Sequence, residues 1–194
     1  MSNNKSRRAA ITAADEAGQI AYTRHLCELY LEAHPDHVPI LIIYASNLIS
    51  LAQYSAAEAA LDHAQPLAPI ERLHFVLAQR GHLLEAKGDF LGAEELFMQA
   101  HKLKPDDATY LIYAGSVAFR RGDINRAQKL AGKAADCSDG CLDEAWFNLG
   151  GYLLSAKRYG DAADCYRKAL EIDPDYEIAR ERLEDVELIL GGEG

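Results

Sequence analysis

The chain has 194 residues, of which 49% are hydrophobic and 26% charged, and 30 acidic residues against 20 basic ones give a net charge of −10. This excess of acid argues against a nucleic-acid binder and against attraction to an anionic membrane. Four cysteines are too few for a disulfide framework, and no apolar run approaches the roughly 20 residues of a membrane span. The N-terminus lacks the apolar segment of a secretory signal, so we expect a soluble, cytoplasmic protein.

The first 37 residues are predicted to form a polar tail followed by two helices. The tail, residues 1–8, is polar after its first residue and is expected to be disordered. A short helix is expected over residues 9–17. A second, amphipathic helix is expected over residues 19–33, and its apolar side is formed by Ile20, Leu26, Leu29 and Tyr30.

A pattern of large apolar and small residues then recurs in four copies, which begin at residues 38, 74, 108 and 143. Each copy is long enough for two antiparallel amphipathic helices, and small residues at their crossing let the two helices approach closely. In the first helix the small residues are Ala45, Gly81, Gly115 and Gly150, and in the second they are Ala57, Ala93, Ala127 and Ala162. The last copy is the most regular and contains Trp146, Leu149, Gly150, Leu153, Ala162, Tyr166, Ala169 and Pro174.

These residues at these offsets resemble the tetratricopeptide repeat. The resemblance implies an all-α fold, a right-handed superhelical solenoid of about four helix-turn-helix repeats with extra helices at both ends. An N-terminal tail and degenerate repeat or helix is expected over 1–37, four repeats over 38–174, and a C-terminal capping helix and tail over 175–194. The individual repeats are expected at 38–73, 74–107, 108–142 and 143–176.

One turn departs from the family pattern, which usually has glycine between the two helices of a repeat. Gly88 and Gly122 occupy this place in two of the copies, each followed by aspartate. In the last copy the residue is Lys157. This turn therefore needs another residue to take up the tight backbone geometry.

The resemblance also implies that the first helix of each repeat lines a concave groove. The residues expected to line it are mainly aliphatic and aromatic: Ile42, Ser46, Ile49, Phe75, Ala78, His82, Thr109, Ile112, Ser116, Phe119, Phe147, Leu154 and Ile178. An apolar surface of this kind usually marks a binding site. We therefore expect a protein or peptide partner, docked as a helix or an extended segment, and an adaptor or cytoplasmic chaperone role.

Two features of the groove bear on its partner. Some family members bind the terminal carboxylate of a chaperone through a Lys, Asn and Arg clamp. Here Ile42, Ala78 and Ile112 occupy slots that would need polar groups, so this subclass is not expected. The alternative to partner binding is that the N-terminal helix or a second copy of the chain covers the groove, which would make the protein a self-associating structural module.

The acidic residues concentrate at the C-terminal end, where residues 143–194 hold 13 acids against 6 bases. One interpretation is a solvated cap, which solenoids need for solubility. The other is a contact for a basic partner segment, in which case the chain would be a stoichiometric, immunity-type inhibitor. The residues proposed for this contact are Asp175, Glu177, Glu181, Glu184 and Asp185.

No catalytic, cofactor or zinc-binding motif is found, so the chain is predicted not to be an enzyme and to need no cofactor or metal. Cys27 and Cys165 lie at apolar helix positions and are predicted to be buried. Cys137 and Cys141 lie in a loop without C-x-x-C spacing, which leaves a redox role as the lesser alternative. Adjacent acidic residues such as Glu94-Glu95 are expected to be solvated rather than to form an acid–base pair.

Overall fold

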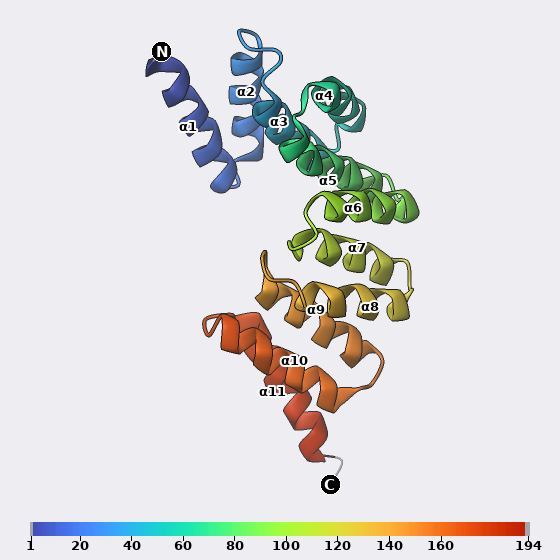
Figure 1. The fold of residues 1–194 in the computed structure, drawn as a ribbon. Coiled ribbons are helices and arrows are strands. Elements are labelled where there is room, and N and C mark those ends of the chain that lie inside the picture. The colour runs from blue at the N-terminus through green and yellow to red at the C-terminus, as the bar shows by residue number, and fades with distance from the viewer. Residues whose placement is uncertain (1, 193–194) are drawn as a thin grey trace. The chain divides into compact units, whose positions relative to one another are not determined.

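The computed structural model describes residues 2–192, with side chains from Asn4 onward, and these residues form helices, turns and one isolated bridge. The described helices, shown in chain order in Figure 1, are α1 (Ser2–Glu16), α2 (Ile20–Leu31), α3 (Val38–Ser50), α4 (Tyr54–Leu67), α5 (Ile70–Ala86), α6 (Phe90–Leu103), α7 (Thr109–Arg120), α8 (Ile124–Ala135), α9 (Leu142–Ser155), α10 (Tyr159–Ile172) and α11 (Glu177–Gly192). This confirms the predicted all-α class. None of these helices is long and apolar enough to cross a membrane.

The chain divides into two compact units, Met1–Asp89 (unit 1) and Phe90–Gly194 (unit 2). Unit 1 contains α1 to α5 and unit 2 contains α6 to α11. Within each unit, every helix packs against the next one along the chain, because each buries an apolar side that it cannot cover alone. The boundary between the units falls inside the predicted repeat 74–107, between its two helices.

Helix α1 begins at Ser2, so the expectation that residues 1–8 are a disordered tail is wrong for the part that is described. The segment contains no glycine or proline before Gly18, and therefore nothing in its sequence interrupts the helix. Ile11 of α1 is buried in an apolar cluster with Cys27 of α2. Burial of this side chain holds α1 against α2.

Helix α11 continues to Gly192, so the predicted glycine tail is helical as far as it is described, and residues 193–194 lie outside the described part. Four apolar residues recur along this helix at spacings of four, three and four, and the first three of them face the core of unit 2. Ala179 and Val186 are buried, and Leu183 packs against the buried cluster around Val186. The fourth, Leu190, is exposed, so the cap covers the core mainly through the earlier turns of the helix.

Small residues lie where the two helices of a repeat pack together, as the pattern predicts. The four alanines of the second helices are fully buried: Ala57, Ala93, Ala127 and Ala162. In the last repeat a Cβ added to Gly150 would lie 2.7 Å from Cε1 of Tyr166, which is closer than van der Waals contact allows. At the equivalent Gly115 the nearest atoms to such a Cβ would be 3.6 Å away. The two glycines therefore occupy the same place in the repeat but leave different amounts of room.

The turns between paired helices contain a left-handed residue. Gly88 and Gly122 adopt φ values of +85° and +88°, which glycine reaches without steric cost. Lys157 and Ala52 occupy the corresponding places with φ values of +61° and +56°. The turn that lacks glycine in the last repeat therefore places lysine itself in this conformation, at a cost of roughly 1–2 kcal/mol from the contact between Cβ and the backbone.

Replacing Lys157 by glycine is accordingly expected to raise the free energy of unfolding by about 0.5–1 kcal/mol, since part of the relief is offset by the greater freedom of glycine in the unfolded chain. Urea denaturation followed by circular dichroism measures the change. The matched control is Gly122→Lys, because no described atom lies within 4 Å of a Cβ at that position and only the backbone conformation is tested. A Gly122→Lys protein as stable as the original chain would contradict the explanation.

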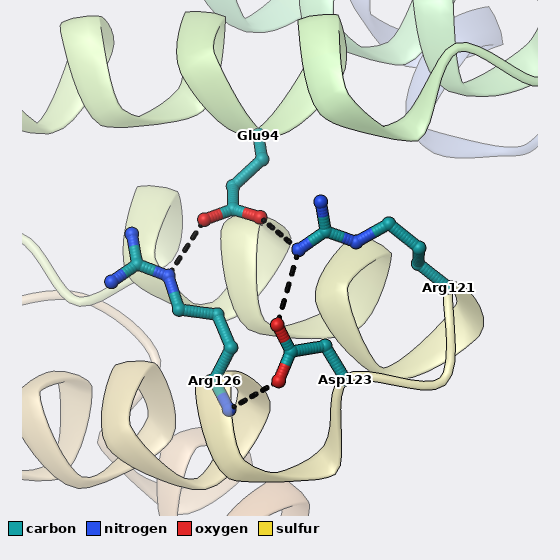
Figure 2. Close-up of polar contacts among 4 residues, drawn as sticks. All are labelled: Glu94, Arg121, Asp123 and Arg126. Carbon is teal, nitrogen blue, oxygen red and sulfur yellow. Dashed lines mark hydrogen bonds and ion pairs between the residues drawn. The ribbon is translucent and has the colours of Figure 1, made fainter.

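A buried acidic residue joins three helices of unit 2, as Figure 2 shows. Glu94 of α6 is only 9% exposed, so the expectation that it is solvated is wrong. Nε of Arg126, on α8, donates to its Oε1 at 2.7 Å, and Nη2 of Arg121, at the end of α7, donates to its Oε2 at 3.3 Å. Asp123 completes the group by accepting from Nη2 of Arg121 at 3.4 Å and from the backbone N–H of Arg126 at 3.0 Å. Both arginines belong to the next helix pair, Arg121 following α7 and Arg126 lying on α8, so Glu94 ties α6 to the following repeat.

Candidate binding surface on the first helices

The first helices of neighbouring repeats touch one another within each unit, α3 against α5 in unit 1 and α7 against α9 in unit 2. Side chains that point away from the second helices on these pairs therefore form one surface in each unit. We call these two surfaces the first-helix faces. Most of the positions that the repeat pattern predicts as the lining of a groove lie on these four helices.

On the first-helix face of unit 1 the predicted residues are mostly half-buried. Ile42 and Ile49 of α3 pack against the core cluster beneath them, and Ser46 lies between them. Phe75 of α5 is the most exposed of the set, with 44% of its surface accessible. His82 is half-buried, and its Nδ1 lies 3.3 Å from Oε2 of Glu85 on the same helix.

Two predicted lining residues belong to the interior instead. Ala78 is 5% exposed and Ile112 is 3% exposed, so neither offers a surface to a partner. The reason is that α5 packs against α3 and α4, and α7 packs against α6, α8 and α9, which leaves only a narrow open side on each helix. The repeat spacing predicts the open side of a helix only to within one residue position. It therefore does not distinguish residues at the edge of that side from residues of the core.

Three partly exposed aromatic rings lie on or beside the first helices of unit 2: Phe119 of α7, Phe147 of α9 and Tyr176 just before α11. We call these three rings the aromatic surface. Phe119 stacks on buried Tyr152 with 4.8 Å between ring centroids and 29° between planes. Phe147 lies 5.7 Å from the ring of buried Tyr166 and 5.1 Å from that of Tyr176. Each phenylalanine is therefore held in orientation by a buried tyrosine, while part of its ring stays open to solvent.

The remaining predicted residues of unit 2 lie on α7, α9 and α11. Thr109 and Ser116 of α7 and Leu154 of α9 are half-buried, and Ile178 of α11 is 52% exposed. Two of these four residues are aliphatic and two carry a hydroxyl group.

Tyrosine hydroxyls near the aromatic surface stay protonated at neutral pH. Burial, followed by the charge of Glu144, raises the pKa of Tyr152 to about 12. The pKa of Tyr176 is raised by the same two causes and by further acidic neighbours. These hydroxyls therefore act as neutral hydrogen-bonding groups, and the Glu144 carboxylate is the nearby charge that both of them feel.

The repeat pattern did not predict Tyr176 as part of this surface. It lies in the linker before α11, within the stretch that the charge distribution marks as an acidic contact. The sequence nevertheless contained a signal for Tyr176. This residue follows Pro174, the proline that ends the last repeat, by two residues, and so lies at the start of the segment that packs on that repeat. An aromatic residue at that place is well situated to reach the preceding first helix.

The acidic residues predicted as a second contact are all exposed, along α11 and just before it. Asp185 forms an ion pair with Arg182 at 3.2 Å, and the neighbouring Glu187 pairs with Arg167 at 2.7 Å. The other four form no ion pair with the described residues: Asp175, Glu177, Glu181 and Glu184. In this described stretch, ion pairs with arginine thus occur at Asp185 and Glu187, near its C-terminal end.

The cysteines are not arranged for nucleophilic chemistry. Burial raises the pKa of Cys27 to about 12 and that of Cys165 to about 11, and the pKa values of Cys137 and Cys141 are also raised, by burial and then by acidic neighbours. A catalytic thiol requires the opposite shift. Among residues 4–192 no group of three or more His, Cys, Asp or Glu side chains could hold a metal ion.

Sequence comparisons agree with the internal pattern. A family profile described as "Tetratricopeptide repeat" matches residues 143–176, and a second profile with the same description matches residues 76–107. The chain is 34% identical over 100 residues to Tetratricopeptide repeat protein 7A of Homo sapiens, which is 52% of this chain and 12% of that protein. It is 30% identical over 119 residues to Small glutamine-rich tetratricopeptide repeat-containing protein 2 of Mycosarcoma maydis, which is 61% of this chain and 32% of that protein. The chain thus spans less than a third of the length of each relative.

Solved structures share the fold at low sequence identity. A tetratricopeptide repeat protein from Parabacteroides merdae aligns over 93% of this chain and 69% of its own, with a TM-score of 0.75 and 19% identity. A thermophilic repeat protein from Thermus thermophilus aligns over 95% of this chain and 99% of its own, with a TM-score of 0.71 and 20% identity. The first repeat domain of Spaghetti, bound to an HSP90 peptide, aligns over 61% of this chain and 93% of its own, with a TM-score of 0.55 and 18% identity. The matched profiles show that the chain contains tetratricopeptide repeats at residues 76–107 and 143–176, and the solved structures show that it shares their fold.

Proposed function

We propose that the chain is an interaction protein that binds a peptide or helical segment of a partner on its first-helix faces, as an adaptor or a chaperone for that segment. The observation that carries this proposal is the aromatic surface of unit 2. Two phenylalanines, Phe119 and Phe147, stay partly exposed although buried tyrosines hold their rings in place. Aromatic side chains that are both exposed and oriented are typical anchors of binding interfaces, because they lose little conformational freedom when a partner covers them.

The chemistry of the surface indicates which segment it accepts. The residues predicted to line the face on α7, α9 and α11 are mainly aliphatic and aromatic, with hydroxyl groups from Thr109 and Ser116, so a segment with apolar residues at helical or alternating spacing fits best. The Spaghetti structure holds a peptide on the same fold, which supports peptide binding as a use of this architecture. The apolar character of Ile42 in unit 1 favours an apolar segment over a terminal carboxylate at that slot.

Peptides selected from a random library against the full chain test the proposal. Phe119→Ser and Phe147→Ser are each expected to weaken the selected peptides about tenfold, as measured by fluorescence anisotropy, because each removes a central aromatic anchor. Leu91→Ser is the matched control, since Leu91 lies on the second helix α6 of the same unit and is 63% exposed. It should leave the dissociation constant within about twofold of the original.

Circular dichroism establishes that each variant is folded before its binding is compared. The proposal fails if folded Phe119→Ser and Phe147→Ser proteins bind as tightly as the original chain, or if selection enriches no peptide at all. Equal weakening by Leu91→Ser would instead place binding outside the first-helix faces.

A further inference from the structure

Glu144 places a negative charge beside the aromatic surface of unit 2. It lies in the first turn of α9, three residues before Phe147, so the two side chains are neighbours on one side of that helix. The ring of Tyr176 lies 5.1 Å from that of Phe147. Burial and then the charge of Glu144 raise the pKa of Tyr176, and the same two causes come first for the raised pKa values of Tyr152 and Tyr113.

These aromatic residues belong to three separate elements. Tyr113 lies on α7, Tyr152 and Phe147 lie on α9, and Tyr176 lies in the linker before α11. The Glu144 carboxylate is the charge that they have in common. A carboxylate among aromatic rings combines the two kinds of group that attract an organic cation, an anion and the negative faces of rings.

The surroundings of Glu144 differ from those of other acidic residues that are withdrawn from solvent. It is half-buried, and its carboxylate forms no ion pair or hydrogen bond with the described residues, which is also true of the adjacent Asp143. Five other acidic residues of the described chain are buried or half-buried, and the carboxylate of each has a hydrogen-bond donor or a cation: Glu28, Glu85, Glu94, Asp107 and Asp173. The positive end of the α9 dipole offsets the charge of Glu144 in part, and a cation supplied by a partner can neutralise the rest.

We propose that the aromatic surface binds an arginine side chain of the partner segment, with its guanidinium group paired to the Glu144 carboxylate and stacked on the rings of Phe147 and Tyr176. A guanidinium group offers two parallel donors to a carboxylate and also lies flat on an aromatic ring, which the compact ammonium group of lysine does less well. The excess of acid over residues 143–194, 13 acidic against 6 basic, favours the approach of such a segment.

This inference rests on the proposed function and deepens it by naming one residue of the partner segment. The apolar residues of that segment lie on the first-helix face, and the arginine fixes the position of the segment along it. The site has the opposite charge to a clamp for a terminal carboxylate.

The test uses the random-library selection against the full chain. The probe is the tightest selected peptide that contains arginine, labelled with fluorescein, and it is compared by anisotropy with the same peptide carrying citrulline in place of that arginine. Citrulline has nearly the shape of arginine without its charge. On the original chain citrulline is expected to weaken binding about tenfold, because the charged pair and the stacked cation are lost. On Glu144→Gln the two peptides should bind within about twofold of each other.

Glu171→Gln is the matched control. Glu171 is exposed on the second helix α10 of the same unit, so this variant removes the same charge away from the aromatic surface. It should keep the roughly tenfold preference for arginine over citrulline and change the affinity of each peptide less than about twofold. Circular dichroism checks that both variants are folded, and the ratio between two peptides on one protein does not depend on that protein's stability.

Four results would overturn the proposal. The selected peptides contain no arginine, or contain lysine in its place. The citrulline peptide binds the original chain as tightly as the arginine peptide. The folded Glu144→Gln protein keeps the full preference for arginine. Glu171→Gln reduces this preference as much as Glu144→Gln does, which would mean attraction to net charge alone.

The same peptides separate this inference from the proposed function. If Phe119→Ser and Phe147→Ser weaken the arginine peptide while Glu144→Gln leaves its preference over citrulline intact, the inference is wrong and the proposed function stands. If neither phenylalanine variant weakens any selected peptide, the proposed function is wrong and this inference fails with it.

Discussion

Replacing Gly150 by alanine is expected to lower the free energy of unfolding by about 2 kcal/mol, within the range that overpacking of a filled core usually costs. The added Cβ would lie 2.7 Å, 2.9 Å and 3.1 Å from three ring carbons of Tyr166. That ring is 1% exposed and packs against the ring of Phe147, so it has no free space into which to move. The clash therefore outweighs the roughly 1 kcal/mol that alanine gains over glycine inside a helix.

The matched control is Gly115→Ala, the same change at the same place in the preceding repeat. There a Cβ would meet its nearest atoms at 3.6 Å, which is ordinary contact, so helix propensity alone acts and the variant should be up to about 1 kcal/mol more stable. Urea denaturation of both proteins gives the comparison. Equal destabilisation by the two changes would show that the position tolerates no side chain for reasons other than the Tyr166 ring.

Replacing Glu94 by alanine is also expected to lower the free energy of unfolding by about 2 kcal/mol, because it leaves two arginines side by side without their shared acceptor. The loss is smaller than the roughly 3–5 kcal/mol of a fully buried pair, since the side chains of Arg121 and Arg126 are 30% and 36% exposed to solvent. Figure 2 shows both guanidinium groups directed at the one carboxylate.

Glu95→Ala serves as the control for this change. Glu95 is exposed, and its Oε1 accepts only a weak hydrogen bond from Gln99 at 3.4 Å among the contacts described, so its loss should stay within about 0.5 kcal/mol. A double-mutant cycle of Glu94→Ala with Arg126→Ala should give a coupling energy of about 1 kcal/mol or more. Additive effects of the two substitutions would mean that the ion pair contributes nothing of its own.

The recurrent pattern of large and small residues was sufficient to predict the paired helices, whereas the lining of a binding groove stays a prediction. Of the residues predicted for it, Phe119 and Phe147 lie on first helices and are partly exposed. The pattern was less informative at the edge of each helix, where Ala78 and Ile112 are buried. A shift of one residue along a helix decides whether a side chain is buried in the core or exposed at the surface. The spacing of the apolar residues is too coarse to predict this difference.

Charge patterns were harder to interpret than apolar ones. Glu94 and Glu95 are adjacent and chemically identical, yet one is buried between two arginines and the other is exposed. Likewise, Arg7 and Arg8 follow one another in the sequence, but they line different pockets. Adjacent residues on a helix point about 100° apart, so the environment of each depends on elements that are distant in the chain.

The sequence by itself determined the all-α class, the repeat family and the apolar character of the first helices, because these follow from local periodicity and from small residues at set offsets. Only the tertiary structure decided that Gly150 has no room for a methyl group while Gly115 has, that Lys157 itself takes the left-handed turn, and that Arg8 and Arg72 meet at one pocket. The room at Gly150 and the meeting of Arg8 with Arg72 depend on distances between side chains of different helices, and the conformation of Lys157 depends on the backbone of the turn between α9 and α10. The spacing of apolar and small residues along the chain fixes neither.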